Sequence, residues 1–439
     1  MTNLCPYCFN DKSLSRRLKE IRPKYPRSEK CTFHPNRSGL PVEAVSPLID
    51  AVISPYYHFG DSNRYFGQDG ESLEQIIYDL TDAEDDDIVN ALIEQLMKDD
   101  QYDPSDGGEP FYQSDQLYVR HSNTHNPHSE AWEKFKDEIT YNRRFFSDLA
   151  RDRLEEIFRD VHLQKNSAGQ PVVYHISPAD EVQIYRARQI DDQAQQDEAV
   201  ASPANKLGSP PKRLRSAGRM NAAGVAAFYG AFDLDTCIAE IRPPVGGMVI
   251  SAIFQIIRPI VVLDLTRFES PIQIRSIFSP VYEARSLQWG FMQSFMHEIG
   301  QPILPNDVLL DYIPSQAVAE FIHRVLPVRI GGEKGQIEAI IFNSAQSPEG
   351  KNIVLFGDAA LVREAKSGDT STSFVKSESE TFQSWDEWEW EEANPALSVS
   401  DDKVVKCCVD GVSFSHQKIA SMSELSIEEQ DQIIADMDI

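Results

Sequence analysis

The chain has 439 residues, of which 41% are apolar, 10% aromatic and 25% charged, with a formal net charge of −27. This length favours two or three domains, and this composition excludes a largely disordered chain. The acidic excess argues against a protein whose whole surface binds nucleic acid or anionic lipid, but it does not exclude a local basic patch.

Charges counted by segment place the acidity in two regions. We divide the chain into a basic N-terminal segment (1–45, net +5), an acidic segment (46–170, net −16), a nearly balanced segment (171–365, net −4) and an acidic tail (366–439, net −12). An anionic substrate is repelled least by 1–45 and 171–365. We therefore expect a site for such a substrate in one of these two segments.

The sequence shows no sign of export or membrane insertion. The N-terminus lacks the basic and apolar regions of a signal peptide. The most apolar run, 247–265, is interrupted by polar residues and a proline, so it is not expected to span a bilayer. Six cysteines are too few for a disulfide scaffold. These features predict a soluble, cytoplasmic protein.

Two Cys-x-x-ligand motifs lie in 1–45: Cys5-Pro-Tyr-Cys8 and Cys31-Thr-Phe-His34. Three thiolates and one imidazole form a complete tetrahedral ligand set for Zn²⁺, and the two-residue gaps let both ligands of a turn reach one ion. We expect a structural zinc knuckle at these four residues, because a catalytic zinc would need an open position. The alternative is a pair of reduced surface turns.

The spacer between the two motifs is rich in basic residues, namely Arg16, Arg17, Lys19, Arg22, Lys24, Arg27 and Lys30. Such a cluster could form a phosphate-binding face. We favour a simpler interpretation, in which it is a solvated face that docks onto the acidic segment next to it.

Segment 46–170 is expected to be mainly helical. Apolar residues recur at helical spacing in three stretches: Leu73, Ile76, Ile77 and Leu80; Ile88, Leu92, Ile93 and Leu96; and a longer stripe through Trp132, Phe135, Ile139, Phe146 and Leu149 to Phe158. The acidic run 82–87 has metal-ligand chemistry in principle, but at the start of a helix it favours capping and solvation.

Segment 171–365 alternates strands and short helices without a regular βαβ repeat, so we expect an α+β fold rather than a doubly wound sheet. Strands are predicted near 171–175, 182–188, 248–265, 337–342 and 352–356, and helices near 233–240 and 316–324. The polar stretch 191–217 is expected to be a long loop.

The acidic tail contains three further features. A tryptophan-rich stretch at 385–390 is expected either to dock on a basic groove or to pack against the preceding domain. A hairpin is predicted at 404–414, and a capping-box helix start at 423–429.

The motifs of P-loop, Rossmann and α/β-hydrolase enzymes are absent from the sequence. Instead, Gly218-Arg-Met-Asn-Ala-Ala-Gly224 predicts a tight turn that carries an arginine, followed by a strand with Tyr229 and a short helix ending near Glu240. A carboxylate on this mainly apolar stretch would be costly without a partner or a role. Singly, an arginine–glutamate pair is more often a structural ion pair, and a strand tyrosine more often belongs to the core.

At these residues the sequence resembles the RES domain family, named for an arginine, a glutamate and a serine. The resemblance covers about 171–365, with a longer gap at 191–217 and Ile-Phe-Asn-Ser at 341–344 where Tyr-Pro-Ser is common. The N-terminal half also resembles the HEPN-like domain that is fused to some RES domains. The family's pieces occur here in order as Arg186, Arg219, Asn221, Tyr229, Glu240, and Ser344 ahead of the strand 352–356.

The resemblance implies a compact ADP-ribosyltransferase-like fold that binds NAD⁺. It also implies an NAD⁺ phosphorylase or glycohydrolase, which cleaves the nicotinamide–ribose bond with phosphate or water as acceptor. Many family members are toxins of bacterial toxin–antitoxin pairs, so an antitoxin protein is an expected partner. We expect NAD⁺ as substrate and a structural Zn²⁺, and we expect neither membrane nor nucleic acid as a partner of this acidic chain.

The residues suit this chemistry. Nicotinamide leaves as a neutral base, so positive charge builds on the ribose as an oxocarbenium ion, which a fixed carboxylate can stabilise. Arginines can donate two parallel hydrogen bonds to a pyrophosphate or phosphate, and a tyrosine can stack on nicotinamide. The serine can bond the carboxamide, a ribose hydroxyl or a phosphate. We therefore expect Arg219, Tyr229 and Glu240 to be catalytic, and Arg186, Asn221 and Ser344 to bind NAD⁺.

Three other functions remain open at this level. The first is transfer of ADP-ribose to a protein or nucleic acid, and the second is RNA cleavage by a HEPN-type pair, Arg120 and His125. The third is binding by a module that zinc holds together, with an inert RES domain. The Arg120–His125 stretch does not lie on a periodic helix, so RNA cleavage is disfavoured. Control of the site by an antitoxin in trans and by the acidic tail in cis are both open.

Overall fold

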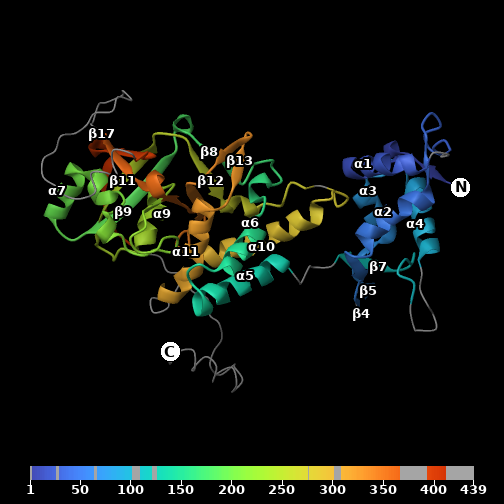
Figure 1. The fold of residues 1–439 in the computed structure, drawn as a ribbon, viewed down its shortest axis with the longest axis horizontal. Helices are drawn as coiled ribbons and strands as arrows, with labels where there is room; N and C mark the ends of the chain where they lie inside the picture. Colours follow the sequence, from blue (N-terminus) through green and yellow to red (C-terminus); the bar gives the residue numbers. More distant parts are fainter. Residues whose placement is uncertain are drawn as a thin grey trace, which may run out of the picture.

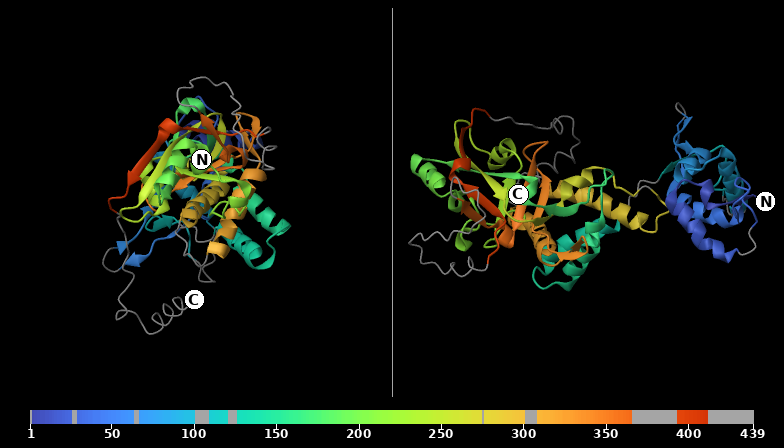
Figure 2. Two further views of the ribbon diagram at one scale, coloured as in Figure 1. Left: turned by 90° about the vertical axis from the view of Figure 1, so that its left-hand side faces the viewer. Right: turned by 90° about the horizontal axis from the view of Figure 1, so that it is seen from above.

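The computed structural model of the chain describes residues 2–25, 29–63, 67–100, 109–120, 126–274, 276–300, 308–365 and 393–411. These residues form two bodies, a smaller one built from the chain up to Arg120 and a larger one built from the rest (Figure 1). A view from above shows the two bodies side by side (Figure 2).

The N-terminal body packs four helices with short strands. The helices are α1 (Lys12–Ile21), α2 (Val42–Ile53), α3 (Leu73–Thr81) and α4 (Asp86–Asp99). The strands are β1 (Asn3–Leu4), paired with β2 (Leu40–Pro41); β4 (Ser62–Asn63), paired with β5 (Gly67–Gln68); and a sheet of β3 (Tyr57–Phe59), β7 (Leu117–Arg120) and β6 (Glu71–Ser72).

The first two predicted stripes are confirmed as α3 and α4, whose apolar faces are buried in one core. The acidic run between them serves as a cap. Asp82 ends α3 with a left-handed φ of 47°, and the Asp85 carboxylate accepts a hydrogen bond from the Asp87 N–H at 2.9 Å where α4 begins. The capping interpretation is therefore confirmed.

The third predicted stripe is wrong as a continuous helix. Helix α5 (Pro127–Asp137) ends in a π-turn (Glu138–Asn142), and α6 (Asp148–Phe158) begins anew, with the Ser147 hydroxyl accepting from the Ala150 N–H at 3.3 Å. Phe146 is 99% exposed and has a φ of 56°, and Leu149 is 50% exposed. A local cap has interrupted a pattern that would otherwise keep helical spacing.

The larger body is built on one mixed sheet with the strand order β17-β18-β11-β9-β10-β16-β15-β12-β8, and β19 also pairs with β11. Only the pairs β12–β15 and β17–β18 are parallel among the described strands, which confirms the mixed α+β class. The strands are β8 (Val173–Ile176), β9 (Gln183–Ile190), β10 (Ala227–Ala231), β11 (Met248–Ile256), β12 (Ile260–Asp264), β15 (Ala339–Asn343), β16 (Lys351–Phe356), β17 (Val362–Ala365), β18 (Leu397–Ser400) and β19 (Val404–Cys408).

Helices cover both faces of this sheet (Figure 1). On one face α5 and α6 pack with α10 (Tyr282–Gly300) and α11 (Val308–Arg324), and the hairpin β13 (Val328–Ile330) and β14 (Glu333–Gly335) extends this core. On the other face lie α7 (Gln193–Ala201) and α8 (Pro203–Leu207). Helix α9 (Leu234–Ile241) packs on β9 and β10.

Two predictions need correction. The stretch 191–217 is not a long loop, because it contains α7 and α8. The carboxylate of Asp192 caps α7 by accepting from the Gln195 N–H at 2.8 Å, and Pro203 starts α8. In the described part of the tail there is no hairpin at 404–414, because β19 pairs with β11 of the main sheet.

The two bodies are tied together by residues 276–282. Ile277 and Phe278 are buried in the core of the N-terminal body. The Ser276 hydroxyl donates to the Asp11 carboxylate at 2.9 Å, and the Arg120 guanidinium donates to the Tyr282 hydroxyl. The larger body therefore supplies part of the core of the smaller one.

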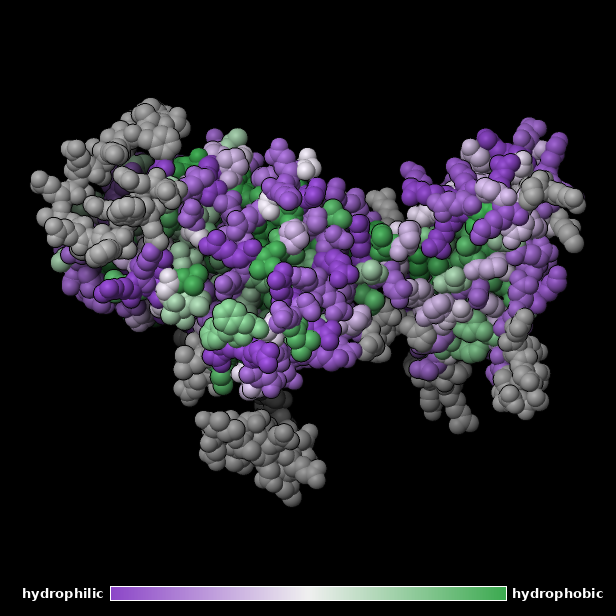
Figure 3. Space-filling model, in the orientation of Figure 1, coloured by the Kyte–Doolittle hydropathy of each residue, from purple (hydrophilic) through white to green (hydrophobic). Residues whose placement is uncertain are grey.

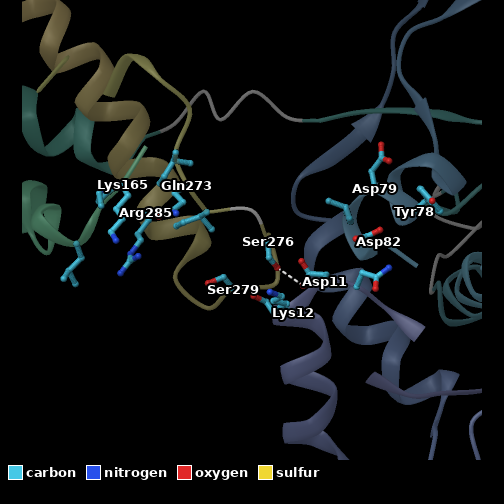
Figure 4. Close-up of a pocket in the computed structure, with 17 residues that line it drawn as sticks. Asp11, Lys12, Tyr78, Asp79, Asp82, Lys165, Gln273, Ser276, Ser279 and Arg285 are labelled. Atoms are coloured by element: carbon cyan, nitrogen blue, oxygen red, sulfur yellow. Dashed lines mark hydrogen bonds between the residues drawn. The ribbon is translucent and has the colours of Figure 1, made fainter. Parts of the chain in front are cut away.

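A cleft of about 750 Å³ opens beside this junction. Asp79 and Asp82 line the cleft on the side of the N-terminal body, and Lys165 and Arg285 of the larger body lie opposite them (Figure 4). The cleft does not contain any residue of the expected RES site.

The boundaries expected at 45 and 170 stay predictions, but hydrophobic cores cross both positions. The first core joins the Cys/His motifs to α2, α3 and α4. The second joins α5 and α6 to the sheet that follows residue 170. Arg27, His125 and the features expected at 385–390 and 423–429 lie outside the described residues. None of the described helices combines the length and apolarity needed to cross a membrane.

Candidate functional site

The turn at 218–224 is closed by a network of hydrogen bonds. Gly218 bridges to Asn221, and a side chain at Gly218 would lie within 2.7 Å of the Tyr229 hydroxyl. That hydroxyl donates to Asn221 Oδ1 at 2.8 Å and accepts from the Met220 N–H at 2.9 Å. The Asn221 amide in turn donates to the Ser216 carbonyl just before the turn at 3.0 Å and to the Ala222 carbonyl within it at 3.1 Å. Tyr229 and Asn221 thus hold the turn that carries Arg219.

Helix α11 fixes the same turn from the other side. The Ser315 hydroxyl donates to the Arg219 carbonyl at 2.5 Å, and the Gln316 amide donates to the Gly218 carbonyl at 2.8 Å. These contacts use only the backbone of the turn. The Arg219 side chain lines the cleft and makes no ion pair with the described residues.

Glu240 lies near the end of α9, a helix that begins where the Asp233 carboxylate accepts from the Thr236 N–H at 2.7 Å. Two side chains donate to its Oε1 atom, the Ser344 hydroxyl at 2.6 Å and the Asn352 amide at 2.7 Å. No described residue donates to Oε2. One carboxylate oxygen is thus fixed by the protein while the other stays free for a ligand.

Arg186 projects from β9 beneath the same cleft. Its guanidinium carbon lies 4.7 Å from the centroid of the Phe228 ring, and its buried Nη1 atom has no hydrogen-bond partner among the described residues. Burial, and then the charge of Arg188, lower the pKa of Arg186 to about 10, so the side chain stays protonated at neutral pH. A buried cationic donor without a partner suits an anionic ligand.

All these groups meet in one cleft of about 600 Å³. Of the six residues expected from the sequence, Arg186, Arg219, Asn221, Tyr229 and Glu240 line it, and Ser344 lies behind Glu240. Among the residues that line it, the arginines outnumber the single carboxylate of Glu240, so the cleft favours an anion.

Sequence reasoning missed several groups in this cleft. Arg215, Arg242 and Tyr312 also line it, and Asn352 binds Glu240. The sequence does contain a signal for Asn352, because this residue begins the predicted strand 352–356 of the family pattern. The pattern itself assigns no role to this first residue. Arg242 follows Glu240 by two residues, but nothing in the sequence pattern shows that it faces the cleft.

The thiol of Cys237 also lines the cleft. Burial raises its pKa to about 12, against the opposing effect of the nearby Arg186 charge. It is therefore protonated at neutral pH and is unsuited to act as a nucleophile.

Cys5, Cys8, Cys31 and His34 come together in the N-terminal body, with their ligand atoms all within 4.8 Å of one another. The Cys8–Cys31 Sγ distance is 3.5 Å, the Cys5–Cys8 Sγ distance is 3.9 Å, and His34 Nδ1 lies 3.5 Å from Cys5 Sγ. Zinc with Zn–S bonds of about 2.3 Å places tetrahedral ligands roughly 3.8 Å apart. The cluster therefore matches the dimensions of a zinc site.

The surroundings of this cluster also suit a metal. His34 faces the thiols through Nδ1 and contacts Glu84 Oε2 through Nε2 at 3.1 Å, which is the kind of outer contact that orients a metal-bound histidine. Burial raises the pKa of the Cys8 thiol, so a bound cation would be needed to hold it as a thiolate.

The basic spacer docks only in part as expected. Backbone bonds join the knuckle to the acidic segment, with the Asn10 N–H donating to the Asp82 carbonyl at 2.8 Å and the Glu84 N–H to the Cys8 carbonyl at 3.1 Å. The described basic side chains of the spacer form no ion pair with a described carboxylate. They remain available on the surface.

Comparison with known families gives one match. The family model described as "RES domain" matches residues 183–375, a span that contains Arg186, Arg219, Tyr229, Glu240 and Ser344. No curated protein and no solved structure matches the chain. The HEPN-like resemblance of the N-terminal half stays a prediction, and Arg120 of the expected pair lies on β7 with its guanidinium bonded to Tyr282.

Proposed function

The chain belongs to the RES domain family through residues 183–375, and from this premise we propose that it degrades NAD⁺ by cleaving the nicotinamide–ribose bond. RES domains are generally associated with NAD⁺-related toxin activity. The observation that carries the proposal is the Glu240 carboxylate, whose Oε1 atom is held by two donors while Oε2 is left open to a ligand. The other charged residues that line the cleft are arginines.

In the reaction, the electron pair of the bond between C1′ and the nicotinamide nitrogen passes to the nicotinamide ring, which leaves neutral. Positive charge develops on the ribose, and Glu240 Oε2 stabilises that charge or holds a ribose hydroxyl. An oxygen of phosphate or water then bonds to C1′, and water loses a proton to solvent in that step.

The arginines bind the anionic parts of the substrate. Arg186 and Arg219 suit the pyrophosphate, because a guanidinium can give two parallel hydrogen bonds to phosphate oxygens. Arg215 and Arg242 also line the cleft and can receive an acceptor phosphate. A phosphorylase needs such a second anion position, whereas a glycohydrolase does not.

Three residues receive refined roles in this proposal. The hydroxyl of Tyr229 is committed to the turn, so only its ring remains to contact nicotinamide. Asn221 acts by holding the turn. Ser344 acts by orienting Glu240, since its hydroxyl donates to that carboxylate and accepts from two backbone N–H groups at 3.1 Å.

The wider assignments are part of the same proposal. They are an ADP-ribosyltransferase-like fold for the larger body, a toxin role with an antitoxin partner, and a structural Zn²⁺ at Cys5, Cys8, Cys31 and His34. The Cys/His cluster supports the last of these by its dimensions.

The test is an assay of NAD⁺ loss and nicotinamide release by the purified full chain with zinc, with and without phosphate. We expect Glu240→Gln to lower kcat by at least about 100-fold. The exposed Glu333→Gln on β14 makes the same chemical change away from the cleft and should leave the rate unchanged. Unchanged NAD⁺ with the wild-type chain, in vitro and in cells, would overturn the proposal.

Detection of ADP-ribose 1″-phosphate by ³¹P NMR would identify phosphate as the acceptor, and free ADP-ribose would identify water. A mass-spectrometric ADP-ribose adduct on a macromolecule would instead indicate a transferase.

A further inference from the structure

The N-terminal body carries a basic groove outside the candidate active site. It lies between the 3₁₀ turn Pro6–Cys8 and α1, has a volume of about 410 Å³, and includes Tyr7 and Phe9 in its lining. Glu84 is the only acidic residue among the described residues that line it, and this carboxylate contacts His34 at 3.1 Å. Figure 3 shows strongly hydrophilic residues over the upper part of the N-terminal body, where Figure 1 places α1.

Three cations of α1 border the groove: Lys12, Arg16 and Lys19. Their spacings of four and three residues place them along one face of the helix, over a length of about 10 Å. All three are exposed, and none pairs with a carboxylate in the part of the chain that the structure describes. This row of charge is unneutralised in a chain whose net charge is −27.

An exposed aromatic stack stands next to this row. Tyr7 is 46% exposed, the Arg37 guanidinium carbon lies 3.7 Å from the centroid of its ring, and Lys19 Nζ lies 5.8 Å from the same centroid. Aromatic rings and guanidinium planes are the surfaces on which unpaired bases stack.

The groove is held rigidly by its surroundings. Tyr7 lies between the cluster residues Cys5 and Cys8, and the Arg37 N–H donates to the His34 carbonyl at 2.8 Å. The opposite face of α1 is anchored by two fully buried leucines. The cationic row and the aromatic stack therefore keep a fixed relation to each other.

We propose that this groove binds single-stranded nucleic acid, with phosphates on Lys12, Arg16 and Lys19 and a base on the Tyr7–Arg37 stack. A duplex keeps its bases paired and cannot use the stack. An acidic peptide could use the cations but has no bases to stack. The inference is independent of NAD⁺ chemistry, because it uses no residue of the RES cleft.

The binding test uses the full chain with zinc and fluorescein-labelled twelve-residue oligonucleotides of uridine or of deoxythymidine, followed by fluorescence anisotropy. We expect the double variant Arg16→Glu/Lys19→Glu to bind at least about tenfold more weakly than the wild type. The matched control Arg329→Glu/Lys334→Glu makes the same charge change on the exposed β13–β14 hairpin and should bind like the wild type.

Salt gives a second readout of the phosphate contacts. If the three cations each replace a counterion, affinity for a single strand should fall by about 20-fold between 50 and 200 mM salt. Tyr7→Ala should weaken binding while Tyr7→Phe should not, with the zinc content of each variant measured to show that the cluster is intact.

Several outcomes would overturn the proposal. They are no binding of either oligonucleotide at 50 mM salt, equal affinity for a duplex or for polyglutamate, and equal weakening by the control variant. Glu240→Gln should bind the oligonucleotides normally, so a failure here is distinguishable from a failure of the NAD⁺ assay.

Discussion

Ser344 and Asn352 donate to the same oxygen of Glu240, and this has a consequence for catalysis. A carboxylate held at one oxygen cannot rotate freely, so its second oxygen presents a fixed negative edge to the cleft. Electrostatic stabilisation depends on such preorganisation, because no reorganisation is then needed as charge develops. The two donors are therefore positioning residues for Glu240.

We predict that Ser344→Ala and Asn352→Ala each lower kcat for NAD⁺ about tenfold or more with little change in KM, because they disturb the carboxylate and leave the arginines in place. Ser344→Thr retains a hydroxyl and should recover most of the rate. The double variant should lose less than the product of the two single effects, since both act through one carboxylate. A loss confined to KM would argue for direct contact with the substrate.

Tyr229 has a measurable structural role. Tyr229→Phe leaves the Met220 N–H without its acceptor and Asn221 Oδ1 without its donor, which should cost about 1–3 kcal/mol of unfolding free energy. Chemical denaturation checks this prediction. Tyr185→Phe is the control, because the Tyr185 hydroxyl donates to the exposed side chain of Gln183 at 3.0 Å and has no other hydrogen-bond partner in the described part of the chain. An equal effect of the two changes would contradict the role assigned to the turn.

At the scale of elements, the Cys/His cluster and the helices of the N-terminal body share one hydrophobic core. Zinc removal should therefore destabilise α1 to α4 together. We predict that a strong chelator, or Cys8→Ser, lowers the Tm of the N-terminal body by several degrees or more and releases zinc detectable by mass spectrometry. Cys408→Ser removes an exposed thiol from β19 and should change neither quantity. A zinc-free wild-type protein with the same Tm would refute a structural metal.

The sequence was informative where local pattern decides structure. The strands of 171–365 are dense apolar runs, and α3 and α4 have regular apolar stripes. Helix α7 was missed because it buries a single residue, Ala199, and so carries no stripe. The break at Phe146 was missed because the cap of α6 lies within an otherwise regular pattern.

The same distinction holds for the candidate site. Arg219, Tyr229 and Glu240 stand in short motifs and could be singled out from the sequence alone. The bond from Asn352 to Glu240 joins positions 112 residues apart, and it exists only because β16 lies beside β10 in the sheet. Register between distant strands is set by the whole fold and not by a local pattern.

The described part of the tail, residues 393–411, contributes two strands to the main sheet. Strands β18 and β19 both pair with β11, and Leu397 and Val399 are buried in the core beneath the sheet. Removal of 366–439 would thus strip two strands from the sheet. We predict that a chain ending at residue 392 has a markedly lower Tm and aggregates, because it exposes the edge of β11.

A chain that ends at residue 411 keeps both strands and isolates the last residues, which makes it the proper test of control in cis. Inhibition by residues 412–439 predicts a higher rate of NAD⁺ loss for this chain. An unchanged rate at an unchanged Tm would exclude control in cis by these last residues.

At the scale of the whole molecule, the two bodies depend on one insertion. Phe278 of the larger body is fully buried in the core of the smaller one. Phe278→Ala should cost about 3–5 kcal/mol at that contact. We predict a larger radius of gyration in small-angle scattering with NAD⁺ turnover retained. Val281→Ala, an exposed position in the same connection, is the control. An unchanged radius would show that other contacts hold the bodies together.

The position of β18 and β19 also bears on how the protein is made. The ribosome synthesises the RES segment well before these strands, yet β11 lacks its outer partners until residue 408 has been translated. Domains generally fold as units as the chain emerges, but this sheet cannot be completed until residue 408 has been synthesised. A ribosome that stops between residues 365 and 397 would therefore release a chain that has every residue of the candidate cleft but neither of these two strands.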